Sequence, residues 1–167
     1  MATSPRSVGL LATVTAAVLL SSLAAAASGQ KTKLGSVAFE LPSGWKVETD
    51  GAGRLTASPS GTPDTPALVM AEFCDLATGR QCPAVEAPDA AKTGCAGPQL
   101  NTKQWSRGIV EKRWICPRTV SPAGAYTLAV GHFITPAWTL RVVYISTDKD
   151  KPPNTFFDHL AKTLRKD

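Results

Sequence analysis

Two histidines and a scattered set of carboxylates are the groups that could make this chain a catalyst. His132 lies in the segment Gly-His-Phe-Ile-Thr and has the chemistry of a base, whereas His159 lies between Asp158 and Leu160. Nucleophilic catalysis needs a serine or cysteine beside a histidine base and an orienting acid. The sequence has no Gly-x-Ser-x-Gly motif, and the spacing of its carboxylates singles out no acid–base pair. The enzymatic hypothesis is therefore a small envelope hydrolase that uses His132 with a nearby carboxylate.

The N-terminus has the composition of a secretion signal. Residues 8–27 are apolar or small, and a single arginine precedes them. The run Ala25-Ala26-Ala27 has the spacing that signal peptidases accept, so we expect cleavage after Ala27. Residues 1–27 would be a signal peptide, and residues 28–167 a single domain that is periplasmic or secreted. The alternative is a retained anchor, because about 20 apolar residues can span a bilayer.

Four cysteines follow in the mature chain, at Cys74, Cys82, Cys95 and Cys116. An even number of cysteines in an exported chain indicates disulfides. Four cysteines allow three pairings, of which we prefer Cys74–Cys82 with Cys95–Cys116 because these bridges close two local loops. A metal site is disfavoured, since there is no Cys-x-x-Cys pair and no histidine near a cysteine.

Composition narrows the classes of partner. The chain carries 18 Lys and Arg against 13 Asp and Glu, a formal net charge of +5. No run of five or six like charges occurs, which disfavours nucleic acid, while the basic ends could attract an anionic membrane surface. The glycine pair Gly51-Ala52-Gly53 is too short for a phosphate loop. We expect a monomer with no cofactor and with another protein as its partner.

Alternating apolar residues predict an antiparallel sheet. Strands are expected over residues 36–41, 45–50, 54–58, 67–74, 109–116, 125–134 and 138–146. The stretch 28–33 reads as a polar leader, and residues 75–102 as one short helix, within 83–93, or as irregular structure that the cysteines hold. Phe156, Phe157, Leu160, Ala161 and Leu164 form the apolar stripe of a C-terminal helix that Asn154 would cap. The fold class is therefore α+β, with about six strands and a C-terminal helix packed on them.

Two positions near residue 110 carry more specific expectations. Alternation places Glu111 and Arg113 opposite Val110 and Trp114, so we expect this charged pair on the outer face of its strand. Trp105 lies among polar residues and is the tryptophan that packing explains least, which makes it a candidate for partner binding.

The opening Phe39-Glu40-Leu41-Pro42-Ser43-Gly44-Trp45 resembles the first hairpin of small PsbP-like and DcrB-like domains. Those domains continue as a meander of strands and end in a helix on the sheet, the place that residues 156–164 would take here. The resemblance implies a non-enzymatic accessory, scaffolding or chaperone-like role. We infer an exported binding protein of the cell envelope, a class that includes immunity-type inhibitors.

Overall fold

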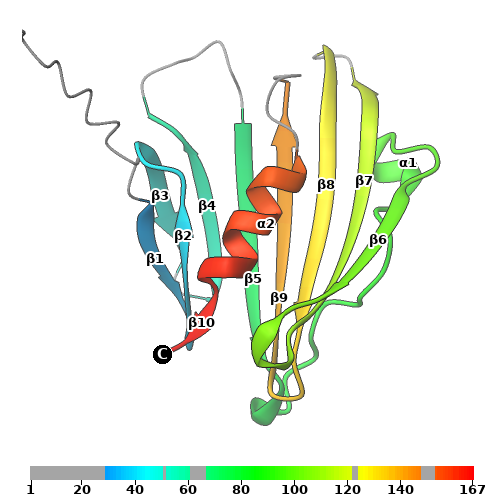
Figure 1. The fold of residues 1–167 in the computed structure, drawn as a ribbon. Helices are drawn as coiled ribbons and strands as arrows, with labels where there is room; N and C mark the ends of the chain where they lie inside the picture. The colour runs from blue at the N-terminus through cyan, green and yellow to red at the C-terminus, as the bar shows by residue number, and fades with distance from the viewer. Residues whose placement is uncertain (1–28, 51, 61–66, 122–123, 148–152) are drawn as a thin grey trace, which may run out of the picture.

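The computed structural model describes residues 29–50, 52–60, 67–121, 124–147 and 153–167. Its centre is a seven-stranded antiparallel sheet in the order β3-β4-β5-β9-β8-β7-β6, beside a three-stranded sheet in the order β1-β2-β10 (Figure 1). The α+β prediction is confirmed, with seven strands in the main sheet where about six were expected. The main strands are β3 (Trp45–Thr49), β4 (Arg54–Pro59), β5 (Ala67–Asp75), β6 (Gln99–Gln104), β7 (Val110–Ser121), β8 (Gly124–Ile134) and β9 (Trp138–Ser146).

The small sheet corrects two expectations at the N-terminal end. The stretch expected to be a polar leader forms β1 (Gln30–Leu34), which pairs with β2 (Val37–Leu41), and β2 also pairs with β10 (Arg165–Lys166). The expected hairpin of β2 and β3 is wrong, because the turn around Gly44 carries the chain from one sheet into the other. Phe39 and Leu41 are fully buried in the core under the C-terminal helix. The packing of β2 against this core therefore outweighs the pairing of β2 with its neighbour in sequence, β3.

Helix α2 (Pro153–Thr163) lies across one face of the main sheet, in front of β5 and β9 in Figure 1. Its apolar stripe is buried as expected, with Phe157 and Leu160 fully inside the core. The expected cap is wrong, because the helix begins at Pro153, whose fixed backbone suits a first turn. The Asn154 side chain instead accepts a hydrogen bond from Arg113, at 2.6 Å.

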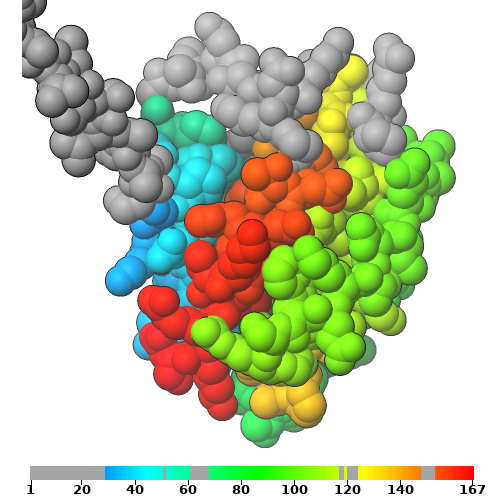
Figure 2. All heavy atoms as spheres, in the orientation of Figure 1, coloured from blue at the N-terminus to red at the C-terminus, as the bar shows by residue number. Residues whose placement is uncertain are grey.

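Edge strand β6 was not expected from the sequence. All six of its residues are exposed, so it lacks the apolar alternation by which a strand is recognised. It pairs with β7 and curls toward α2, so that β6 and the short turn η2 (Ser106–Gly108) close the helix face of the molecule (Figure 2). The remainder of the irregular region holds η1 (Leu76–Thr78) and the four-residue helix α1 (Ala90–Thr93).

Candidate binding groove

Both faces of the main sheet are covered, and the second cover is held by disulfides. Cys74 in β5 is bonded to Cys82, and Cys95 is bonded to Cys116 in β7. These are the two local bridges that the sequence favoured. They pin residues 75–98 to the face of the sheet opposite α2, where this stretch forms almost no regular structure.

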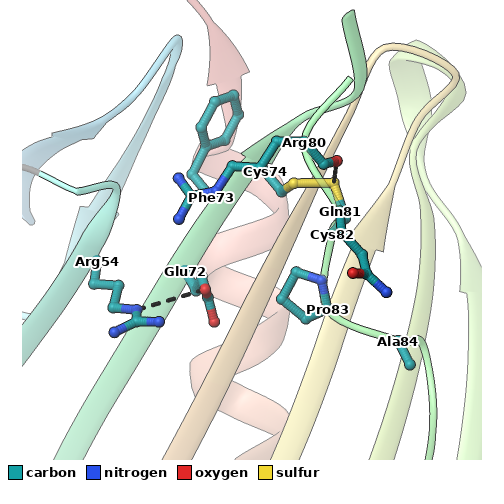
Figure 3. A pocket seen from close by; sticks show the side chains of 9 residues that line it. All are labelled: Arg54, Glu72, Phe73, Cys74, Arg80, Gln81, Cys82, Pro83 and Ala84. Atoms are coloured by element: carbon teal, nitrogen blue, oxygen red, sulfur yellow. Dashed lines mark hydrogen bonds and ion pairs between the residues drawn. A yellow bond between two sulfur atoms is a disulfide. The ribbon is translucent and has the colours of Figure 1, made fainter. Parts of the chain in front are cut away.

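A hollow lies beside the first disulfide (Figure 3). It has a volume of about 400 Å³, and Arg54, Glu72 and Arg80 line it. Arg54 Nε lies 3.5 Å from Glu72 Oε1, and Arg80 donates a long hydrogen bond of 3.4 Å to the carbonyl of Ala52. We name this the arginine hollow, because two guanidinium groups share it with a single carboxylate.

A second hollow of about 530 Å³ lies further along the same face. Its floor is apolar and comes from β5, β8 and β9, while residues 83–93 form its wall. Met70 on this floor is 40 % exposed, which is unusual for a large apolar side chain in a central strand. We name this the apolar hollow; its floor residues are Met70, Leu128, Val130, Val143 and Ile145.

Pro83 and Ala84 line both hollows, so the two meet along the tethered segment. We call them together the groove, and residues 80–93 its wall. Sequence reasoning missed Arg54, Arg80 and Met70. One signal was present, because β5 is apolar on both sides of its alternation, which is typical of a strand covered on both faces.

His132 does not form the acid–base pair that the hydrolase hypothesis requires. Its side chain is 1 % exposed, and it lies edge-on to Trp114 with the ring centroids 5.7 Å apart. Its Nε2 has no hydrogen-bond partner among the residues that the structure describes. Burial, with the nearby cations of Arg141 and Lys112, lowers the pKa of His132 from 6.5 to about 4. The imidazole is thus neutral and enclosed, and the charged groups that act on it among the described residues are the cations of Arg141 and Lys112.

The expectation that Glu111 and Arg113 face solvent is wrong. They are 1 % and 3 % exposed, because this side of β7 is the side that α2 covers. Arg113 Nε donates to Glu111 Oε1 at 2.6 Å, and its other nitrogens donate to Asn154 and Asp158 on α2. The pair therefore ties the sheet to the helix. Strand periodicity places residues on a face correctly but cannot reveal which faces the tertiary structure covers.

Trp105 is half-buried and packs against the main core. Its indole Nε1 donates to Glu111 Oε2 at 2.7 Å, and the Lys103 ammonium lies 3.9 Å from the ring centre. These contacts give Trp105 the packing role that the sequence did not reveal. A part in partner binding stays a prediction for its exposed portion.

Two further features were looked for in the described part of the chain, a cluster of metal-ligating side chains and a membrane-spanning helix. Within this part of the chain, no three His, Cys, Asp or Glu side chains gather as a metal site would require. No helix of the described residues is long and apolar enough to cross a lipid bilayer. The expected signal peptide, residues 1–27, lies outside the described residues.

Comparison with protein-family models and with curated proteins gives no match. Solved structures do match. The solution structure of cyanobacterial PsbP from Synechocystis sp. PCC 6803 is similar with a TM-score of 0.54 and 14% sequence identity, over 84% of this chain and 94% of that one. LpqN of Mycobacterium tuberculosis, described as involved in cell envelope biogenesis, is similar with a TM-score of 0.49 and 14% identity, over 82% of this chain and 84% of LpqN. The chain has a PsbP-like fold.

Proposed function

We propose that this chain is an exported, non-enzymatic accessory protein of the cell envelope that binds another protein in the groove. The observation that carries the proposal is the groove itself, in which exposed Met70 and half-buried Ile145 lie under a wall that two disulfides hold in place. A fold supports many functions, so the argument rests on this site and not on the PsbP-like fold.

Two further features support the proposal. Disulfides persist in oxidising compartments, in agreement with the signal-like sequence of residues 1–27. Inside the groove, the side chain of Met70 is exposed and that of Ile145 is half-buried, and exposed apolar surface is typical of an interaction site. Neutral, enclosed His132 offers no support for the hydrolase hypothesis.

A photo-crosslinking amino acid at position 70, in the chain expressed in its own host, tests the proposal. Position 100 is the matched control, because Leu100 is also a large exposed apolar residue, 56 % exposed, but lies on edge strand β6 outside the groove. We expect a crosslinked product of one defined mass from position 70 and not from position 100. Products that are absent from position 70, or identical from both positions, would contradict the proposal.

The identity of the captured protein then separates two roles within this class. If it is a hydrolase or toxin that loses activity when the purified chain is added, the role is inhibition. If its activity is unchanged, the role is that of an accessory or scaffold protein.

A further inference from the structure

The backbone of the wall is open for hydrogen bonding. No backbone–backbone hydrogen bond joins residues 80–88 to any residue that the structure describes. Pro83 and Pro88 have no N–H group, so residues 84–87 hold the free donors of the apolar hollow's wall. Three of these four residues are exposed, and Val85 is half-buried. Polar backbone groups of an ordered segment usually pair with other protein groups or with water, and those that face water are available to a bound peptide.

The wall is fixed at both ends before any partner arrives. Cys82 ties its start to β5, and the Cys95–Cys116 bridge lies just beyond its other end. Tyr126 of β8 adds a further anchor, because its hydroxyl donates a hydrogen bond of 2.8 Å to the carbonyl of Thr93 at the end of the wall. A wall restrained in this way loses little conformational entropy on binding.

The accessible part of the floor is the exposed side chain of Met70 and the half-buried side chain of Ile145, and the hollow of about 530 Å³ above them has room for peptide side chains. Val143 and Met70 are direct cross-strand neighbours, and Ile145 lies two residues along β9 on the same face. In an extended chain every second side chain points the same way, so alternate apolar residues of a peptide beside the wall would rest on this floor.

The charge of the groove favours an acidic partner. The arginine hollow holds the guanidinium groups of Arg54 and Arg80 against one carboxylate, that of Glu72 (Figure 3). Arg141 lines the neighbouring apolar hollow, and no hydrogen bond or ion pair joins its guanidinium to a described residue. Two acids line the apolar hollow. Asp89 is paired with Lys92, whose Nζ lies 3.4 Å from its carboxylate, and Glu86 is the one acid of this hollow without a cation among the described residues. Arginine forks bind carboxylates through paired hydrogen bonds.

We propose that the wall is a docking strand for an extended peptide segment of the partner, which pairs with the backbone of residues 84–87, places alternate apolar side chains on the floor and sets an acidic group at the arginine hollow. This inference rests on the proposed function and names the chemistry of the partner. Four extended residues span about 13 Å, so the part of the docked segment that pairs with the wall would be about four residues long. An acyl chain would fill the floor but leave the backbone donors unused, which is why a peptide fits better.

Selection from a displayed library of random dodecapeptides against the folded mature chain tests this. We expect the selected peptides to alternate apolar residues and to carry Asp or Glu near one end. In an extended peptide alternate amides point to the same side, so N-methyl groups on the amides that face the wall remove the donors that would pair with it. Such peptides should bind at least about tenfold more weakly. Methylation of the opposite register is the matched control and should leave the affinity within about twofold.

Amide hydrogen exchange gives a second readout at the wall itself. In the free protein the amides of residues 84–87 should exchange rapidly, and the selected peptide should slow them at least about tenfold. The substitution Arg80→Gln should weaken the peptide about tenfold, while Lys31→Gln on the small sheet should leave its affinity unchanged.

Three results would overturn the inference. They are a selection that yields no common pattern, wall amides that still exchange rapidly with peptide bound, and sodium dodecanoate that binds the groove and excludes every peptide. If position 70 still crosslinks to a protein partner in these cases, the proposed function stands and only the docking mode fails. If position 70 also gives no product, the proposed function fails with it.

Discussion

Gly131 and Phe157 are in direct contact across the interface of sheet and helix. The ring of Phe157 on α2 occupies the space that a Cβ atom at position 131 of β8 would need. Gly131 therefore sets how closely α2 approaches the sheet. Phe157 is fully buried, so its ring has no open direction in which to move.

Replacing Gly131→Ala should lower the free energy of unfolding by about 1–3 kcal/mol, the usual penalty of an overpacked core. Urea denaturation measures it. In the background of Phe157→Leu the same substitution should have a much smaller effect, because the ring that it meets is gone. Equal effects in both backgrounds would mean that the contact does not limit the approach of α2.

His132 should make stability depend on pH in a defined window. Its pKa is about 4 in the folded chain and near 6.5 when unfolded, so the unfolded chain binds more protons between these values. The His132 contribution to stability should be constant above about pH 6.5 and fall by about 3 kcal/mol as the pH drops toward 4. His132→Gln should remove this part of the pH dependence, whereas His159→Gln, an exposed position, should retain it. Urea midpoints across this range provide the measurement.

The buried Arg113–Glu111 pair should matter more than an exposed pair of similar geometry. Arg113→Met leaves the Glu111 carboxylate buried without its cation, a loss of about 3–5 kcal/mol. Lys46→Met removes a pair with Glu48 whose side chains are 70% and 67% exposed, and should change stability by less than about 1 kcal/mol. Equal unfolding midpoints for the two variants would refute this difference.

Trp105 should prove to be a stabilising residue. Trp105→Phe removes the indole donor of Glu111, whose carboxylate is buried, and should cost about 1–3 kcal/mol in the free energy of unfolding. Thermal unfolding followed by circular dichroism checks this. Leu100→Ala on the adjacent strand is the control, and its exposed side chain should contribute less than about 0.5 kcal/mol. An unchanged melting temperature for Trp105→Phe would contradict the stabilising role and favour a role of Trp105 in partner binding.

The second disulfide should stabilise the chain and hold the wall. Its loop has a sequence separation of 21, for which the loop-entropy model gives about 3 kcal/mol. The double variant Cys95→Ala, Cys116→Ala should lose about that much stability, and proteolysis should cut it first within residues 83–94. First cleavage elsewhere would show that the bridge is not what restrains the wall.

The local elements were predictable because their signals are local. The apolar stripe of residues 156–164 sets both the length and the buried face of α2, since helical spacing brings those side chains to one side. The strands rich in branched residues, β5, β8 and β9, were expected within one or two residues of their observed bounds. The exposed strand β6 and the short β1 lack that pattern, so only pairing with a neighbour defines them.

The sequence by itself determined the class of fold, the strands of the sheet and a helix to cover it, because these follow from the spacing of apolar residues along the chain. It also favoured the disulfide pairing that the structure contains, since short loops close at the least entropic cost. Only the tertiary structure decided that β2 leaves β3, that Glu111 and Arg113 are buried, and that Arg54 and Arg80 meet at one hollow. Each of these depends on which distant segment covers which face, and that choice is made by the packing of the whole chain.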